Sequence, residues 1–141
     1  MRIGIEAQRV LRLNRHGMDV VALNLIRALL QIDRDNHYIV YIDRPDVDNE
    51  LGEWENLEKR VLRAPGGYPV WEQVALPRAA RADRLDLLHL TSNTAPLSVD
   101  ACVVVTLHDM IFLKDTDPAA GQGSLYQRLG RIYRRWNCLL Y

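Results

Sequence analysis

The stretch RIGIEAQRVLRLNRHGMDVVALNLIRALLQIDRDNHYIVYID, residues 2–43, decides the fold. Apolar residues alternate with others over residues 2–7, and this segment is rich in Ile, which predicts a strand. A polar, basic loop over 8–17 comes next, and from 20 to 32 apolar residues recur at helical spacing. Residues 37–43 are β-branched and aromatic, which predicts a second strand. The stretch therefore predicts a β-α-β unit.

The rest of the chain continues the alternation of strands and helices. We expect a brief strand over 60–64 and a helix over 69–83 that is kinked near Pro77. Residues 85–90 and 101–107 are compact apolar runs, typical of central strands that are covered on both faces. The alternation predicts an α/β fold: one Rossmann-like domain with a doubly wound, mainly parallel sheet.

Two segments are harder to assign from their pattern. Residues 46–59 are acidic and weakly periodic, which fits a short helix or an irregular connection. From Ser124 onward the pattern predicts a final amphipathic helix with Arg and Gln residues opposite one apolar stripe. That stripe consists of Leu125, Leu129, Ile132 and Trp136.

Composition excludes several classes of protein. The 141 residues fit one domain, and their net charge of zero leaves no basic footprint, so we expect no nucleic-acid partner. Cys102 and Cys138 form neither a disulfide framework nor a metal cluster, and the N-terminus lacks a signal-peptide pattern, so we expect a cytoplasmic protein. No run approaches the roughly 20 apolar residues of a membrane span. The Arg134–Arg135 pair fits a solvated helix face, with peripheral contact to an anionic membrane as the alternative.

Ligands of such sheets bind beyond the carboxyl ends of the strands, which here are followed by residues 8–19, 91–96 and 108–112. In the first loop Gly17 precedes a helix, where backbone N–H groups hold phosphates, although a glycine that only provides a positive φ explains it equally well. The dinucleotide, Walker and nucleophile-elbow motifs are all missing, and the histidines lack zincin spacing.

The other two loops carry polar groups suited to a sugar ligand. Thr91, Ser92, Asn93 and Thr94 offer hydroxyl and amide groups for sugar hydroxyls, with ordinary turn chemistry as the alternative. His108 and Asp109 follow a buried strand, where a histidine either contacts a reacting sugar or is satisfied by a backbone carbonyl.

Four further residues are expected to have structural roles. We expect Trp71 to pack against the sheet and Glu72 to favour the helix dipole. For Trp54 and Trp136 the expectation is packing in a core or an interface.

The order of several strings resembles the N-terminal, acceptor-side domain of glycosyltransferase family 4, which has the GT-B fold. The strings are RIGIEAQ, HGMD, LIRALLQIDRDNHYIVYI, YPVWEQVALP, DLLHLTSNTAPL and VVVTLHDMIFL. The resemblance implies a retaining transferase with a nucleotide-sugar donor and no catalytic metal or other cofactor. It places Gly17 near the donor phosphates, His108 against the transferred sugar and Asp109 beside it. It also assigns acceptor choice to the loops that contain His16 and Thr91 to Thr94.

The sequence departs from the family at Asp19, where a second glycine is common, and at Glu6, where Asp is common. We expect residues 1–141 to be the N-terminal domain only, without the C-terminal donor-binding domain, and therefore to be inactive alone. The expected partners are a nucleotide sugar, a glycan or lipid-linked acceptor and the second domain. The alternatives are a non-catalytic binding module that forms a homodimer, favoured by an apolar patch near Trp136, Leu139 and Leu140, and a small nucleotide-binding domain.

Overall fold

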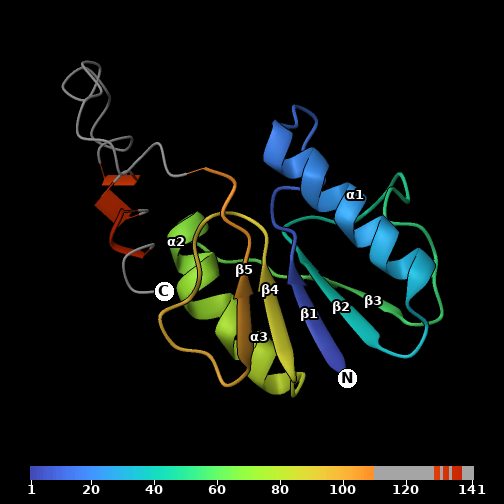
Figure 1. Cartoon of the computed structure of the whole chain (residues 1–141). Coiled ribbons are helices and arrows are strands. Elements are labelled where there is room, and N and C mark those ends of the chain that lie inside the picture. The colour runs from blue at the N-terminus through green and yellow to red at the C-terminus, as the bar shows by residue number, and fades with distance from the viewer. Residues whose placement is uncertain (110–128, 131, 134, 138–141) are drawn as a thin grey trace.

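All five strands of the sheet run parallel, in the spatial order β3-β2-β1-β4-β5 (Figure 1). The structure is a computed structural model that describes residues 1–109, 129–130, 132–133 and 135–137. The strands are β1 (Arg2–Glu6), β2 (His37–Ile42), β3 (Leu57–Val61), β4 (Leu87–Leu90) and β5 (Cys102–Val105). The helical segments within residues 1–109 are α1 (Gly17–Ile32), α2 (Tyr68–Val70), η1 (Trp71–Ala75) and α3 (Leu76–Ala82). The predicted α/β fold is confirmed.

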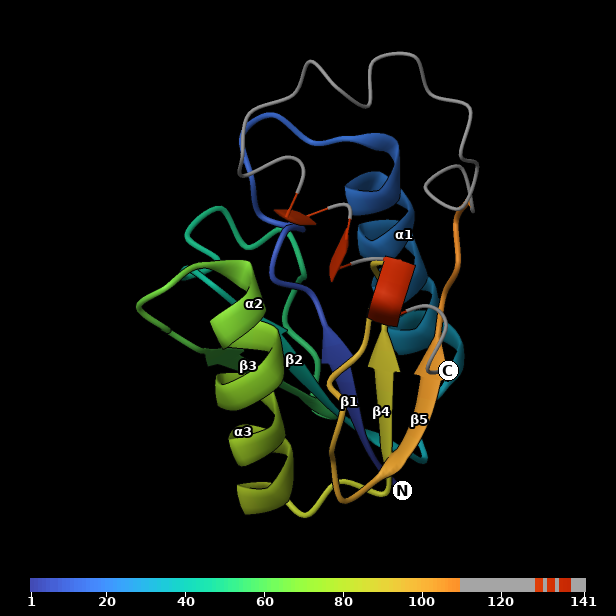
Figure 2. The ribbon, with the colours of Figure 1, turned by 90° about the vertical axis from the view of Figure 1, so that its left-hand side faces the viewer.

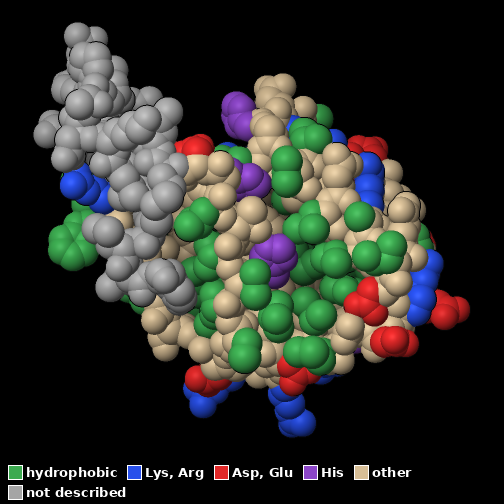
Figure 3. Space-filling view, in the orientation of Figure 1, with side chains coloured by type: hydrophobic (Ala, Val, Ile, Leu, Met, Phe, Trp, Pro, Cys, Tyr) green, Lys and Arg blue, Asp and Glu red, His purple; other side chains and the backbone are tan. Residues whose placement is uncertain are grey.

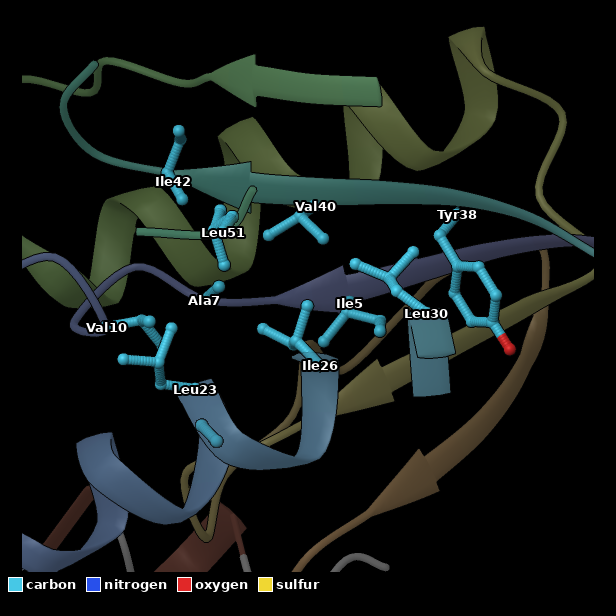
Figure 4. Packing of buried hydrophobic residues seen from close by; sticks show 11 residues of the cluster. Ile5, Ala7, Val10, Leu23, Ile26, Leu30, Tyr38, Val40, Ile42 and Leu51 are labelled. Carbon is cyan, nitrogen blue, oxygen red and sulfur yellow. The ribbon is translucent and has the colours of Figure 1, made fainter. Parts of the chain in front are cut away.

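Helix α1 covers one face of the sheet over β1 and β2. Its apolar stripe, with Leu23, Ile26 and Leu30, packs on Ile5 of β1 and Val40 of β2 (Figure 4). Ile26, Leu30, Ile5 and Val40 are fully buried. The predicted β-α-β unit therefore forms because the helical spacing gives α1 an apolar face. This face and the apolar side chains of β1 and β2 bury one another.

The helical run from α2 to α3 covers the opposite face (Figure 2). Trp71, Leu76 and Ala80 join Tyr41 of β2 and Leu88 of β4 in a second buried cluster. The indole N–H of Trp71 donates to the carbonyl oxygen of Leu62 at 2.9 Å, so the expected packing of Trp71 against the sheet is confirmed.

A π-helical turn, η1, interrupts this run just before Pro77. Proline has no N–H, and its ring would clash with the carbonyl group four residues earlier, at Gln73. The Leu76 N–H accordingly donates five residues back, to the carbonyl oxygen of Trp71. The irregularity predicted near Pro77 is thus present as a π turn. Within this turn, Glu72 and Gln73 contact Thr94 and Ala95 of the loop that follows β4.

Two strand predictions need correction. The third strand begins at Leu57 rather than at residue 60, because β3 pairs in register with β2, Tyr38 opposite Leu57. The segment 101–107 was expected in the centre of the sheet, but β5 pairs only with β4 and lies at the described edge. Val103 packs on the second cluster, whereas Cys102 is exposed. Hydrophobic side chains gather on the face of the molecule beside α1 that no described helix covers (Figure 3).

The helix predicted from Ser124 onward is present in its described part, residues 129–130, 132–133 and 135–137. Ser124, Leu125 and Arg134 lie outside the described residues. The helix docks through Tyr133 and Asn137, and Trp136 is 66% exposed. Of the two environments expected for Trp136, the core is therefore wrong, and an interface stays a prediction. None of the helices in the described part of the chain has the length and apolar character that a bilayer span requires.

Candidate functional site

The order of the strands reverses between β1 and β4. From β1 the chain builds outward through β2 to β3, and then returns to place β4 and β5 on the other side of β1. Loops that leave the carboxyl ends of strands at such a reversal separate, which is where open α/β sheets bind ligands. The carboxyl ends of β1, β4 and β5 and the start of α1 lie at one edge of the molecule (Figure 2). The described parts of the three loops expected to bind a ligand, residues 8–19, 91–96 and 108–109, lie at this edge.

Glu6, the last residue of β1, is a buried carboxylate at this reversal. Its side chain accepts hydrogen bonds from the Ser92 hydroxyl at 2.9 Å, the Thr91 hydroxyl at 3.0 Å and the Gln8 backbone N–H at 3.0 Å. Burial raises the pKa of the Glu6 carboxyl, and these three hydrogen bonds oppose the rise. Glu6 therefore ties the loop after β1 to the loop after β4.

Glu72, in the π turn, is a second buried carboxylate. The Tyr68 hydroxyl donates to it at 2.7 Å, and the hydroxyls of Thr94 and Tyr133 also donate to it. Burial and the nearby carboxylates Glu6 and Glu72 raise the pKa of Tyr68 well above its ordinary value. The expectation that Glu72 serves mainly the helix dipole is therefore incomplete, because its carboxylate organises a buried polar cluster.

Tyr68 joins the two carboxylates into one network. Its hydroxyl lies 2.9 Å from the Ser92 hydroxyl, which in turn contacts Glu6. The Tyr68 ring stacks on Trp71 with centroids 6.4 Å apart, which fixes the hydroxyl in place. Contacts thus connect Glu6, Ser92, Tyr68 and Glu72. Each hydroxyl has one proton, so while Ser92 donates to Glu6 and Tyr68 donates to Glu72, the contact between the two hydroxyl oxygens has no proton of its own.

The predicted acceptor-binding loop is held from beneath by this network. The hydroxyls of Thr91 and Ser92 donate to Glu6, and that of Thr94 donates to Glu72. Asn93 has a positive φ of 55°, and its side-chain oxygen accepts from the His108 backbone N–H at 2.7 Å. The structure therefore brings these residues together through internal contacts, and their contact with a sugar remains a prediction.

His108 follows β5 and reaches back across the end of β4. Its Nε2 lies 2.9 Å from the carbonyl oxygen of Thr91. Since a carbonyl only accepts, Nε2 must carry the proton, and in the neutral ring Nδ1 then has the lone pair. The backbone-carbonyl partner weighed for His108 is present, and it leaves Nδ1 as an acceptor for a ligand hydroxyl. Asp109 is exposed beside it, and residues 110–112 lie outside the described residues.

Gly17 is the first residue of α1, at the same edge. Its φ is not positive, so the proposal that it serves only to provide a positive φ is wrong. A Cβ atom added to Gly17 would meet nothing within 4 Å. Among the described residues, neither backbone conformation nor internal packing requires a glycine there.

His16 and Asp19 shape the start of the helix around Gly17. The His16 backbone N–H donates to the Asp19 carboxylate at 2.9 Å, and Arg9 Nε lies 3.4 Å from the other Asp19 oxygen. Asp19 is buried while the His16 side chain is exposed. The negative charge of Asp19 is therefore paired inside the loop, which lessens its repulsion of an anion near Gly17.

Sequence reasoning missed Glu6, Glu72 and Tyr68 as a unit. The available signal was a carboxylate as the last residue of an otherwise apolar strand, since a charge there needs buried donors nearby. Among the described residues, no group of three His, Cys, Asp or Glu side chains is placed to hold a metal ion. Comparison of the chain with family models, with curated proteins and with solved structures gives no match.

Proposed function

We propose that the chain is the acceptor-side domain of a retaining GT-B sugar transferase, whose donor nucleotide is bound mainly by a second α/β domain. The observation that supports this most is the placement of Gly17, His108 and Ser92 at the same carboxyl edge, where the strand order reverses. These residues come from three separate loops, and the sequence resemblance assigns each loop to substrate contact.

In this proposal His108 contacts the transferred sugar through Nδ1. The hydrogen bond from Nε2 to Thr91 fixes the ring, and the Asn93 side chain holds the His108 backbone. A fixed imidazole ring is useful because catalysis needs groups that are already oriented when charge develops in an oxocarbenium-like transition state. The proposed reaction needs no catalytic metal, and its acceptor is a glycan or a lipid-linked sugar.

Gly17 would let a donor phosphate approach the start of α1. The helix has 16 residues, so its first backbone N–H groups carry a substantial positive partial charge. Glu6 and Glu72 would act indirectly in this scheme, by holding the loop that carries Ser92 and Thr94 in one conformation.

The proposal is tested by titrating isotope-labelled chain with monosaccharides, disaccharides and nucleotide sugars, and following backbone amide shifts. We expect saccharides to shift the amides of residues 91–94 and 108, with a weaker response to His108→Ala protein. Shifts confined to other surfaces, or none with any ligand, would refute it. The two-domain part is tested separately at the parent locus, where the proposal expects a second α/β domain encoded in frame.

One observation favours the alternative, a non-catalytic binding module. The hydroxyls of Thr91, Ser92 and Thr94 are all engaged by buried carboxylates, which would suit a loop that only supports the fold. In that case Thr94→Val would lower stability without changing saccharide shifts elsewhere at the edge. Under the transferase proposal, loosening this loop weakens saccharide binding as well.

A further inference from the structure

The contacts between Glu6 and Glu72 need one hydrogen more than the two hydroxyl groups between them supply. The Ser92 oxygen lies 2.9 Å from the Glu6 carboxylate and 2.9 Å from the Tyr68 hydroxyl. The Tyr68 hydroxyl lies 2.7 Å from the Glu72 carboxylate. These three contacts require three hydrogens, but Ser92 and Tyr68 carry only two. When both carboxylates are ionised, one contact therefore brings two oxygen atoms together without a hydrogen between them.

A proton on Glu6 would complete this set of hydrogen bonds. Glu6 would then donate to Ser92, and Ser92 would donate to Tyr68, over the same distances. Tyr68 would still donate to Glu72. The Thr91 hydroxyl, 3.0 Å from the Glu6 carboxylate, has a closer acceptor in the Glu6 carbonyl oxygen at 2.8 Å. Each hydrogen then has an acceptor, as is usual for buried polar groups.

Two features place this proton on Glu6 rather than on Glu72. Three hydroxyls donate to Glu72, namely those of Tyr68, Thr94 and Tyr133. Only two hydroxyls lie beside the Glu6 carboxylate, and both carboxylates also have N–H donors at 3.0 to 3.3 Å. Because donors stabilise an ionised carboxylate, Glu72 keeps the negative charge. Burial raises the pKa of Glu6, and the charge of Glu72 raises it further.

We infer that Glu6 keeps its proton at a pH where the other glutamates are ionised, and that this proton ties the loop after β4 to α2. Loss of the proton leaves two negative charges beside Tyr68, and Ser92 then donates to Glu6 instead of to Tyr68. The contact between Ser92 and Tyr68 loses its hydrogen, so the loop separates from α2. Glu6 is thus a positioning residue of the candidate site and acts through Ser92. This inference does not depend on sugar transfer.

The elements around this pair carry further titratable side chains. Tyr68 lies on α2 and Tyr133 on the last helix, and burial together with the adjacent carboxylates raises the pKa of both. Their hydroxyls therefore keep their hydrogens while Glu6 titrates. The remaining segments contribute His108, whose ring contacts a backbone carbonyl oxygen, and the ion pair of Arg9 with Asp19. Among the charged groups, Glu72 is the one that acts on Glu6.

The test is a pH titration of protein labelled with ¹³C at the glutamate carboxyl carbons, whose NMR shifts report protonation. The sequence has six glutamates, so substitution can assign the signals. We expect one carboxyl to stay protonated when the others are ionised, and its signal to be missing from Glu6→Gln protein. The backbone amides of residues 91–94 should shift with the same midpoint in the wild type. They should not do so in Glu6→Gln, because the glutamine amide donates to Ser92 at every pH.

Tyr68→Phe tests the chain of hydrogen bonds itself. Without the Tyr68 hydroxyl, Ser92 donates to ionised Glu6 and no contact lacks a hydrogen. The midpoint of the Glu6 titration should therefore fall by about one pH unit, which is a tenfold loss of proton affinity. Tyr38→Phe is the matched control, because the Tyr38 hydroxyl donates to Asp33, and it should leave the midpoint unchanged.

Circular dichroism first establishes that the variants fold as the wild type does. Glutamates that all titrate together in the wild type would overturn the inference. A retained proton whose signal persists in Glu6→Gln would also overturn it, as would loop amides that do not follow the carboxyl midpoint. These three outcomes need only the wild type and Glu6→Gln, so the inference can be refuted even if Tyr68→Phe does not fold.

Discussion

The Ser92 hydroxyl donates a hydrogen bond of 2.9 Å to the carboxylate of Glu6, and this contact joins the ends of β4 and β1. The two residues are separated by 86 positions in the sequence. Because Glu6 is buried and Ser92 also touches Tyr68, the charge of Glu6 is linked to the conformation of the candidate site. Stability and site geometry should therefore respond together when Glu6 titrates.

Glu6→Gln should change how stability depends on pH. Burial raises the pKa of the Glu6 carboxyl above its ordinary value of 4.5, so the folded protein binds this proton more tightly than the unfolded chain. That contribution to stability is fully present below the unfolded-state pKa and is lost as the pH rises through the folded-state pKa. Urea unfolding at a series of pH values should show this decline in wild type and a flatter profile in Glu6→Gln.

Glu58→Gln is the control for the sign of this effect. The Arg60 side chain holds the pKa of Glu58 below its usual range, so its contribution is present above the unfolded-state pKa and is lost as the pH falls. Glu58→Gln should therefore leave the decline at rising pH in place. If Glu6→Gln retains that decline too, burial of Glu6 is not its cause.

Tyr68→Phe should destabilise the protein through the buried network. The change removes the Tyr68 hydroxyl, which donates to Glu72 and contacts Ser92. Thr94 and Tyr133 still donate to Glu72, so the expected cost is that of one buried hydrogen bond, about 1 kcal/mol. Tyr38→Phe is the matched control, because the Tyr38 hydroxyl donates to Asp33 at a turn that water reaches. Equal losses in the free energy of unfolding for the two variants would show that the Tyr68 hydroxyl contributes no more to stability than the Tyr38 hydroxyl does.

Ile26→Ala should measure how much packing in the first core cluster contributes to the free energy of unfolding. Ile26 is fully buried between α1 and the β1–β2 face, and removal of such a side chain costs about 2–5 kcal/mol. Val21, on the same helix, is 50% exposed, so Val21→Ala should cost less than about 1 kcal/mol. Chemical denaturation compares the two directly, and a small loss for Ile26→Ala would mean that α1 packs less closely on the sheet.

Local patterns in the sequence predict those parts of the fold that local forces determine. The alternation in residues 2–7 and the helical spacing up to Ile32 identify β1 and α1 because each element buries one face. Pro77 marks an irregular turn because a missing N–H acts on its own helix. The position of β5 at the edge was not predictable from its apolar residues, since it depends on which strands pair with it.

The candidate site shows the same division. Its loops were predictable, because carboxyl ends of parallel strands meet at one edge and a reversal of strand order opens a space there. Its internal contacts were not, because the hydrogen bond that Ser92 donates to Glu6 and the contact between Tyr68 and Thr94 join residues far apart in sequence. The outward face of Trp136 was also hidden, since an amphipathic pattern does not state which face docks.

His108 should be in the Nε2-protonated tautomer when neutral. Its Nε2 donates to the Thr91 carbonyl oxygen at 2.9 Å, which only an N–H can do. Long-range proton–nitrogen NMR correlations of the imidazole report the tautomer, and Nδ1 protonation would contradict the proposed contact with sugar. His108→Ala should keep the fold and weaken saccharide binding. The ring of His89, on β4, contacts Thr106 just after β5, and His89→Ala should leave saccharide binding unchanged.

Gly17→Ala separates a structural role for this glycine from a role in binding. Gly17 begins α1 without a positive φ, and its added Cβ would meet nothing within 4 Å. Alanine should therefore be neutral or stabilise the protein by up to about 1 kcal/mol, because it lowers the conformational entropy of the unfolded chain and has a higher helix propensity than glycine.

If a donor phosphate approaches the backbone of Gly17, the same methyl group stands in its path. We therefore expect Gly17→Ala to weaken binding of nucleotide sugars while the melting temperature is unchanged or higher. Gly4→Ala is the contrasting variant, because its Cβ would lie 2.3 Å from Leu85 Cδ1 and should destabilise the sheet. Unchanged nucleotide-sugar binding by Gly17→Ala would remove Gly17 from the site, whereas loss of stability would mean that the start of α1 needs a glycine for its own structure.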